Sequence, residues 1–264
     1  MSSNPESAFD WGYIGHAFAR VGRATVPLYG PRGQRVPVHG GCGVVVSLDE
    51  HLFILTAAHV HLGLEENERG QAFAAFDGGL VPIRGRTYRS EPDADREDEA
   101  DAAVIHLAVD DEVVRLRPAA ISLDADCVYE GPQIGEPCAL RGYPHRDAAR
   151  VRGGTVTAKW HTWAGYAAQT EAIDVVSKRS VKQLAMKMPL DDLRDPTGAR
   201  VRSVSPAGCS GSGLWTLPLD GEAKLAGIFT EVRSQHFVAT SIIAHVGLIV
   251  RFAPEALDWD GPSL

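Results

Sequence analysis

The chain has 264 residues, and at about 150 residues per domain this length fits one large domain or two small ones. Hydrophobic residues make up 44% of the sequence and charged residues 23%, an ordinary globular composition that excludes a disordered tail protein and a collagen-like fibre. The formal net charge of -8 lacks the basic footprint of a general nucleic-acid-binding protein, so we expect no nucleic-acid partner.

The N-terminal residues, MSSNPESAFD, are polar and acidic, with neither the basic start nor the apolar stretch of a secretory signal. No apolar run approaches the roughly 18 residues that a membrane-spanning helix needs. The cysteines at positions 42, 127, 138 and 209 show neither a CxxC pair nor zinc-site spacing, and we interpret them as reduced, buried thiols. These features predict a cytoplasmic protein without a membrane partner.

Most ordered segments have the signature of short strands, because they are rich in Val, Ile, Thr and aromatic residues and end at Gly, Pro or Asp. They cover residues 41–47, 52–57, 102–107, 135–143, 153–160, 183–189, 212–217, 225–232 and 237–241. Apolar residues at helical spacing predict a closing helix over 241–252 and a further helix near 13–23. Many short strands and few helices favour all-β barrels or sandwiches over a parallel α/β sheet.

The chain divides best at a cluster of glycines and prolines between Gly131 and Pro137. Because such residues favour a turn or hinge, we expect an N-terminal unit of residues 1–131 and a C-terminal unit of residues 132–264. The one strongly biased segment, the acidic EPDADREDEAD at 91–101, is interpreted as a solvated loop.

Three motifs, in the order His, Asp, Ser, stand out as carriers of chemistry. His59 lies in LTAAHV after a predicted strand, Asp101 directly precedes the strand AAVIHL, and Ser210 lies in GCSGSG. A serine hydroxyl is a poor nucleophile until a neighbouring base takes its proton, and an imidazole base needs a carboxylate to fix its tautomer. Glycines on both sides of Ser210 allow a tight turn whose N–H groups point at a developing oxyanion.

These motifs resemble those of the trypsin-like serine peptidases of the chymotrypsin fold, in their bacterial form. GCGVVVS and ILTAAHV are similar to the family's histidine site, DAAVIHL to its aspartate site, and GCSGSGLW to its nucleophile loop, GxSG(G/S). LAGIFTEV is similar to the strand that lines the primary specificity pocket, and GEPCALRGYP with GGTVTA to the opening of the second barrel. The resemblance covers residues 41–241, with the motifs in the family's order.

The resemblance implies two perpendicular, antiparallel six-stranded β-barrels with a C-terminal helix and a site in the cleft between the barrels. It makes His59 the general base, Asp101 its orienting partner and Ser210 the nucleophile. The backbone N–H groups of Gly208 and Ser210 would form the oxyanion hole. Thr230 stands where the family usually has a serine beside the aspartate, so its hydroxyl is expected to support Asp101.

By the same resemblance, the substrate-binding residues are Val204, Phe229, Thr230 and Val232. Val204 stands where an aspartate would select Lys or Arg, and Val232 replaces a glycine that is usual in the family. These residues imply a restricted, largely apolar pocket for small or medium uncharged side chains. An inward-facing Arg202 or Arg233 would instead select an acidic residue.

Other interpretations of the same residues fit less well. Cys209 as nucleophile requires Gly-x-Cys-Gly, but Ser210 follows it here, and an α/β-hydrolase elbow requires GxSxG with acid and histidine after the serine. Asp98 is a rival to Asp101 that lacks a strand directly after it. His59 and His61 have no third metal ligand at a convincing spacing and HExxH is absent, so we expect no metal and no cofactor.

The sequence therefore predicts a specific, intracellular serine endopeptidase that acts on a protein or peptide substrate. An intracellular peptidase needs restraint, so a regulatory protein partner is a second expectation, and trypsin-like proteins of this kind occur in bacterial defence and signalling operons. The polar segments between residues 177 and 200 would shape the pocket and become ordered on binding. The alternative is a catalytically inactive relative of this fold that binds a peptide or a partner.

Overall fold

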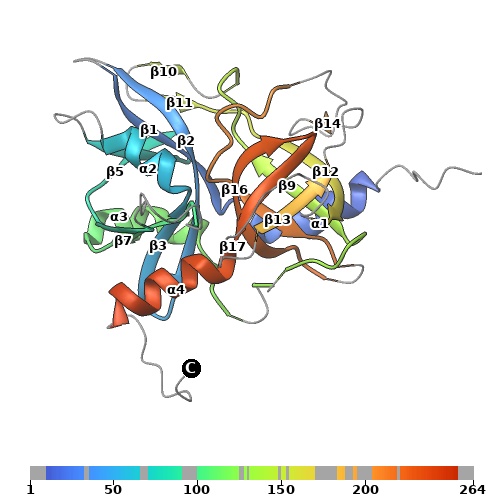
Figure 1. The fold of residues 1–264 in the computed structure, drawn as a ribbon. Helices are drawn as coiled ribbons and strands as arrows, with labels where there is room; N and C mark the ends of the chain where they lie inside the picture. Colours follow the sequence, from blue (N-terminus) through green and yellow to red (C-terminus); the bar gives the residue numbers. More distant parts are fainter. Residues whose placement is uncertain are drawn as a thin grey trace, which may run out of the picture.

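The structure is a computed structural model that describes residues 10–32, 36–65, 71–90, 100–124, 128–129, 131–147, 150–152, 155–169, 183–187, 193–194, 204–218 and 221–254. Within these ranges the chain forms two β units, with a helix near each end (Figure 1). The first unit lies on the left of Figure 1, in blue to green, and the second on the right, in yellow to red. In the described ranges, no helix combines the length and the apolar character that crossing a membrane requires.

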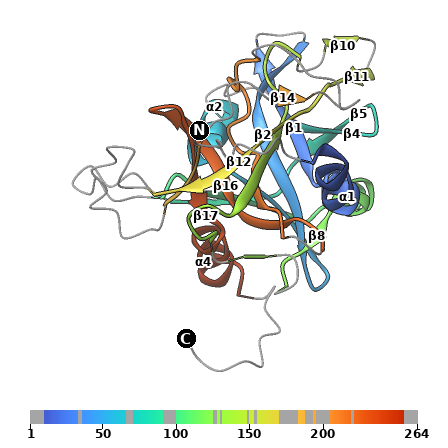
Figure 2. The same cartoon turned by 90° about the vertical axis from the view of Figure 1, so that its right-hand side faces the viewer.

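The first β unit is a sheet with the strand order β10-β11-β5-β4-β1-β2-β3-β7-β6, and β8 adds to β2 in parallel. Its strands are β1 (Thr25–Arg32), β2 (Val36–Leu48), β3 (His51–Thr56), β4 (Ala72–Phe76), β5 (Gly79–Ile83), β6 (Arg86–Arg89), β7 (Ala103–Leu107), β8 (Ile121–Ser122), β10 (Arg150–Arg152) and β11 (Thr155–Thr157). In Figure 2, β10 and β11 extend the sheet beyond β5 at the upper right.

The second β unit is a closed barrel. Its strand order is β13-β17-β16-β15-β9-β12, and a further pairing of β13 with β12 closes the ring, with β14 attached to β12 outside it. The strands are β9 (Pro137–Gly142), β12 (His161–Ala168), β13 (Gln183–Lys187), β14 (Leu193–Arg194), β15 (Gly213–Thr216), β16 (Lys224–Arg233) and β17 (His236–Ser241). The barrel is antiparallel throughout, and an apolar cluster that includes Trp163, Phe229 and Phe237 fills it.

Strand alternation divides the apolar residues of β2 and β3 between two cores. Val45 and Ile54 belong to the cluster inside the first unit. Their neighbours Val44 and Phe53 belong to a larger cluster that also contains Trp215 of the second unit. Because successive side chains of these strands point to opposite faces, the same two strands build one unit and join it to the other.

Helices cover the ends and edges of the two units. They are α1 (Trp11–Val21), α2 (Ala58–Glu65), α3 (Asp110–Leu116) and α4 (Ile242–Phe252), with the 3-10 helix η1 (Arg117–Ala119) directly after α3. Asp10 caps α1, because its carboxylate accepts hydrogen bonds from the N–H groups of Gly12 and Tyr13 at 2.9 and 3.2 Å. Ser241 caps α4 by accepting from the N–H of Ile243 at 3.4 Å.

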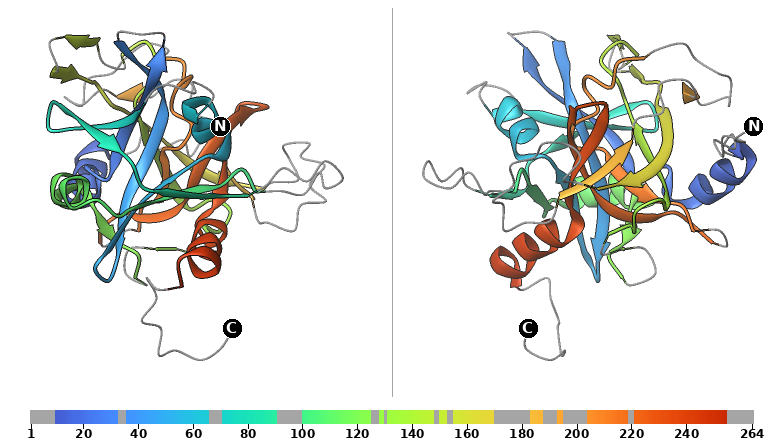
Figure 3. Two further views of the ribbon diagram at one scale, coloured as in Figure 1. Left: turned by 90° about the vertical axis from the view of Figure 1, so that its left-hand side faces the viewer. Right: turned by 45° about the vertical axis from the view of Figure 1, so that its right-hand side comes forward.

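Each terminal helix packs on the unit built from the other end of the chain. On α1, the ring of Phe18 meets the indole of Trp215 edge to face with centroids 5.9 Å apart, and Arg20 forms an ion pair with Glu222 at 3.0 Å. Helix α4 contacts β6 and β7 of the first unit as well as β16 and β17. Figure 3 shows α4, in red, at the lower edge of the molecule in both views.

The expected all-β fold of two β units with a C-terminal helix is confirmed. The predicted helices near 13–23 and over 241–252 correspond to α1 and α4, and each predicted strand segment overlaps a strand. One assignment is wrong: GGTVTA was expected in the second barrel, but its strand β11 pairs with β5 of the first unit. The division of the chain at residue 131 stays a prediction, and the acidic segment 91–99 lies outside the described residues.

We expect the Phe18→Ala variant to lose about 3–5 kcal/mol of unfolding free energy, because it removes a buried ring from the contact between α1 and the second unit. Urea denaturation followed by tryptophan fluorescence measures this loss. The matched control is Val114→Ala, whose side chain is 71% exposed and whose effect should stay within about 0.5 kcal/mol. Equal effects of the two substitutions would show that α1 is not part of the cooperative fold.

Candidate active site

His59 lies near the start of α2, just after the buried strand β3. The carbonyl of Ala57, directly after that strand, accepts hydrogen bonds from the N–H groups of Val60 and His61, both at 3.2 Å. These bonds form the first turn of the helix. Val60 and His61 are buried, whereas the His59 side chain is 51% exposed. A rigid strand thus holds the helix whose first turn presents the imidazole.

Asp101 directly contacts His59. It lies two residues before β7, which pairs with β3, so the register of these strands brings the carboxylate to α2. Its Oδ2 is 2.6 Å from Nδ1 of His59, and its Oδ1 accepts the backbone N–H of His59 at 3.0 Å. A carboxylate that holds Nδ1–H leaves Nε2 free to take a proton. The rival residue Asp98 lies outside the described residues.

The two groups shift each other's ionisation toward the charged pair. The hydrogen bond that the His59 ring donates to Asp101 raises the pKa of His59 above its ordinary value; burial opposes this, while the charges of Asp101 and Glu231 add to it. For Asp101, burial by itself would raise the pKa, but hydrogen bonds from His59 outweigh burial and hold the pKa below its ordinary value. Asp101 therefore stays ionised and stabilises an imidazolium at His59.

Hydrogen bonds on both sides fix the Ser210 loop between the two β units. The N–H of Cys42 in β2 donates to the carbonyl of Ser210 at 2.7 Å, and the N–H of Gly211 donates to the carbonyl of Phe229 in β16 at 2.8 Å. Gly211 has a φ of 90°, and a Cβ at this position would collide with the carbonyl of Cys42. Only glycine fits this close approach of one unit to the other.

The hydroxyl of Ser210 donates to the backbone carbonyl of Thr230 at 2.9 Å. Within the described part of the chain it forms no hydrogen bond with His59. Because a single O–H donates to one acceptor, transfer of its proton to His59 requires this side chain to leave the Thr230 carbonyl. The structure therefore joins the predicted base to its carboxylate, and leaves the predicted nucleophile hydrogen-bonded elsewhere.

The two N–H groups expected to form an oxyanion hole, those of Gly208 and Ser210, make no hydrogen bond with another described residue. The neighbouring N–H groups are engaged: Cys209 donates to the carbonyl of Pro206 at 2.8 Å, and Ser212 donates to that of Cys209 at 2.9 Å. Gly208 has a φ of 92°, which a glycine adopts without strain. The oxyanion-hole role of these two N–H groups stays a prediction.

The expectation for the Thr230 hydroxyl is wrong. Its Oγ1 donates to the carbonyl of Val238 on the neighbouring strand β17 at 3.1 Å, and not to Asp101. The pairing of β16 with β17 turns this side chain into the barrel wall, where Thr230 is 7% exposed. Thr230 instead meets the site through its backbone carbonyl, the acceptor for Ser210.

The remaining expected substrate-binding residues lie in two different environments. Val204 and Phe229 are buried in one apolar cluster, where Phe229 packs edge to face on Phe237. Val232 is 41% exposed, on the same strand as Phe229. Their role in binding substrate stays a prediction.

Two residues near the site were missed by sequence reasoning. Glu231 follows Thr230 on β16 and contributes negative charge to His59, and it forms an ion pair with Arg233 at 3.1 Å. That pair engages the arginine that was expected to select an acidic residue; Arg202 lies outside the described residues. Alternating charged residues at the end of the apolar strand LAGIFTEVR were the available signal.

The second missed residue is His245 of α4. It is fully buried, and its Nε2 donates to the backbone carbonyl of Thr56 at 3.0 Å. This bond ties the closing helix to the last residue of β3, just before His59. A single histidine in a mostly apolar helix gives no sequence signal that distinguishes this hydrogen bond to β3 from ordinary burial of the side chain.

No cluster of three or more His, Cys, Asp or Glu side chains suited to a metal ion occurs in the part of the chain that the structure describes. Of the cysteines, Cys42, Cys138 and Cys209 are described, and all three are buried free thiols. Burial raises the pKa of Cys209 well above its ordinary value, so this thiol is protonated beside Ser210. A buried, protonated thiol is a poor nucleophile.

Comparison with known proteins supports the fold. No protein-family model and no curated protein sequence matches the chain. Among solved structures, an inactive serine-to-alanine mutant form of Rv3671c from M. tuberculosis matches with a TM-score of 0.50 and 15% identity, over 96% of this chain and 98% of that one. Mouse brain neuropsin, a serine protease, matches with a TM-score of 0.50 and 14% identity, over 88% of this chain and 94% of that one. These likenesses and the closed barrel confirm the chymotrypsin-type fold.

We expect the Gly211→Ala variant to be destabilised and to lose reaction of Ser210 with a fluorophosphonate probe, because a Cβ would push the loop away from Cys42. Thermal unfolding and probe labelling measure the two effects. The control is Gly247→Ala within α4, where a Cβ meets nothing within 4 Å. That helical substitution should leave labelling intact and stabilise the fold slightly. Wild-type behaviour of Gly211→Ala would contradict the packing argument.

We expect Asp101→Asn to lower the pKa of His59 and Glu231→Gln to lower it by a smaller amount, because the hydrogen bond and charge of Asp101 are the larger stabilisers of the imidazolium. An NMR titration of the His59 ring measures both shifts. Glu222→Gln is the control, since its carboxylate is ion-paired with Arg20 beside α1 and should leave the titration unchanged. A His59 pKa that is the same in wild type and Asp101→Asn would overturn the assignment.

Proposed function

We propose that the chain is a serine endopeptidase that cuts peptide bonds with Ser210, His59 and Asp101. The observation that carries the proposal is the 2.6 Å contact between Nδ1 of His59 and Oδ2 of Asp101, beside a serine loop hydrogen-bonded to both β units. The chymotrypsin-type fold, shared with the serine protease neuropsin, supports the same activity. No metal or cofactor enters the proposed reaction.

In the proposed mechanism, the Ser210 oxygen attacks the peptide carbonyl carbon while Nε2 of His59 takes the hydroxyl proton. Asp101 keeps Nδ1–H of His59 directed toward itself and stabilises the imidazolium. The N–H groups of Gly208 and Ser210 donate to the oxyanion, each worth about 3–4 kcal/mol in the transition state. The imidazolium then protonates the leaving amine. Water, deprotonated by His59, releases the acyl group from Ser210.

The proposed substrate is a protein or peptide that offers a small or medium uncharged side chain to an apolar pocket. The apolar character of Val204 and Phe229, which belong to one apolar cluster, supports this preference. Ion pairing of Arg233 with Glu231 weakens the case for selection of an acidic residue. An intracellular setting and a regulatory protein partner, in a bacterial defence or signalling system, are further parts of the proposal.

A second candidate function is a catalytically inactive module that binds a peptide or partner on the same surface. The hydrogen bond between Ser210 and the Thr230 carbonyl favours it, because a hydroxyl held there is not activated by His59. The two functions differ in one measurable property, the reactivity of the Ser210 oxygen toward an electrophile.

We expect a fluorophosphonate probe to label the wild-type protein and Ser210→Ala to abolish labelling, because the variant lacks the attacking oxygen. The same substitution should lower kcat for a cleaved peptide by about 10⁶-fold. In-gel fluorescence and mapping of the labelled peptide by mass spectrometry measure the reaction. His59→Ala should reduce labelling strongly as well, since the hydroxyl then lacks its base.

The matched controls are Ser212→Ala and Cys209→Ala, which alter neighbouring buried side chains in the same loop. Both should retain labelling at Ser210, and loss of labelling only in Cys209→Ala would assign the nucleophile to the thiol. A folded wild-type protein that no fluorophosphonate labels, with or without peptide substrates, would favour the inactive module.

A further inference from the structure

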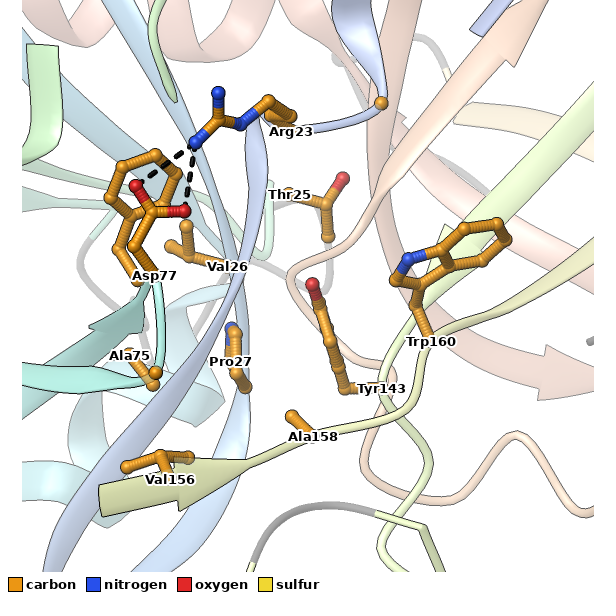
Figure 4. A pocket seen from close by; sticks show the side chains of 13 residues that line it. Arg23, Thr25, Val26, Pro27, Ala75, Asp77, Tyr143, Val156, Ala158 and Trp160 are labelled. Carbon is orange, nitrogen blue, oxygen red and sulfur yellow. Dashed lines mark hydrogen bonds and ion pairs between the residues drawn. The ribbon is translucent and has the colours of Figure 1, made fainter. Parts of the chain in front are cut away.

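A cavity of ≈ 210 Å³ lies between the two β units, lined by segments far apart in the sequence (Figure 4). One wall is the start of β1, a second is the turn between β4 and β5, and a third is formed by Tyr143 and the segment 156–160. The lining of the cavity includes none of His59, Asp101 and Ser210, although the backbone N–H of Tyr143 donates to Sγ of Cys42 at 3.5 Å. The cavity is therefore distinct from the Ser210 loop.

The size and the walls of the cavity suit one aromatic ring. Phe76, Tyr143 and Trp160 supply aromatic surface, and Val26 and Val156 supply aliphatic surface. An apolar cavity of about 150 Å³ in a protein is large enough for benzene. The present volume therefore holds a single ring that carries one small substituent.

Hydrogen-bond donors border the same space. In Figure 4 the hydroxyl of Tyr143 and the indole nitrogen of Trp160 face the space between the walls. Burial raises the pKa of Tyr143 to about 12, so this hydroxyl remains a donor at neutral pH. Thr25, which also lines the cavity, is 2% exposed, and its hydroxyl has no hydrogen-bond partner among the described residues. A ligand with acceptor oxygens would match these groups.

A buried cation lies directly behind the wall. The guanidinium of Arg141 packs over the rings of Phe18 and Trp160, at 4.1 and 4.0 Å from their centroids, and against Gly22. Its Nε donates to Oγ1 of Thr162 at 3.1 Å, and it has no ion pair with a carboxylate among the described residues. A buried charge without a counter-charge is unfavourable, so an anion beside it would be stabilised.

The charges at the rim do not cancel this cation. Arg23 and Asp77 form a two-point ion pair, with Nη2 at 2.8 and 3.0 Å from the two carboxylate oxygens (Figure 4). Because that pair is neutral as a whole, it does not offset the charge of Arg141.

We propose that this cavity binds a small aromatic carboxylate, with the ring between the aromatic walls and the carboxylate beside Tyr143 and Trp160, where the charge of Arg141 acts from behind the Trp160 ring. The ring of such a ligand would contact the apolar walls. Its single negative charge would accept from the hydrogen-bond donors and be attracted by the Arg141 guanidinium. Free phosphate lacks the apolar body, and a neutral ring lacks the charge. The proposal concerns binding alone and does not depend on the proposed peptidase activity.

Isothermal titration calorimetry of the full chain with benzoate tests the proposal, with benzyl alcohol and inorganic phosphate as separate arms. Saturable binding of one benzoate per chain is expected, with benzyl alcohol at least about ten-fold weaker and phosphate not measurable, a ten-fold ratio corresponding to about 1.4 kcal/mol. Equal binding of benzoate and benzyl alcohol, or tighter binding of phosphate, would overturn the ligand class. Absence of saturable binding to the folded wild type would overturn the site.

Two variants locate the binding. Arg141→Met should reduce the preference for benzoate over benzyl alcohol to near unity, because it removes the charge and keeps an apolar side chain between Phe18 and Trp160. If that variant does not fold, Ala158→Phe decides the question, since it fills the cavity from its wall and should abolish benzoate binding. Ala108→Phe, on an exposed position, is the control that should bind like wild type. Unchanged binding in folded Ala158→Phe would place the ligand elsewhere.

Discussion

The hydrogen bond from the N–H of Cys42 to the carbonyl of Ser210 is the contact on which the arrangement of the candidate site depends. It joins β2 of the first unit to the serine loop of the second, at a distance that excludes any side chain at position 211. Thr56, near the end of β3, donates its hydroxyl to the Cys42 carbonyl at 2.7 Å and extends the same contact toward His59. The close contact between Cys42 and the Ser210 loop thus sets the spacing between Ser210 and β3, the strand that precedes His59.

Around this contact the site is assembled from both units, and each unit contributes a different kind of group. The first unit supplies the ionisable pair of His59 and Asp101, held by the register of β3 with β7. The second unit supplies the hydroxyl of Ser210, the backbone donors of its loop and the carbonyl of Thr230. In the proposed mechanism, proton transfer between the units requires the Ser210 hydroxyl to leave the Thr230 carbonyl. The local backbone is already fixed on both sides of that residue.

The two units are also joined away from the site, and these further connections explain the cavity. Helix α1 begins at the chain's N-terminal end yet packs on the second barrel, and Arg141 of β9 inserts between Phe18 of that helix and Trp160. The segment that follows Tyr143 returns to the first unit, where β11 pairs with β5. These connections border the cavity between the units. Aromatic side chains line it, and Arg141 lies behind the Trp160 ring.

The all-β class was accessible from local strand patterns, and the candidate triad from the resemblance of three short motifs to a known family. Short apolar runs with turn residues specify strands, and LTAAHV, DAAVIHL and GCSGSG carry their chemistry within a few residues. Strands that lack such a local pattern could not be predicted from the sequence. HTWAGYAA of β12, for example, contains small and polar residues, and only the barrel around it makes it a strand.

The sequence by itself determined that strands dominate, and that histidine, aspartate and serine motifs occur in order. Only the tertiary structure decided that His59 contacts Asp101, that the Thr230 hydroxyl turns to Val238, and that β11 joins the first unit. The structure also showed that the charge of Glu231 acts on His59 and that His245 binds the Thr56 carbonyl. The physical reason is that hydrogen bonds and charges act over a few ångströms in space, and the residues that share them lie tens of positions apart along the chain.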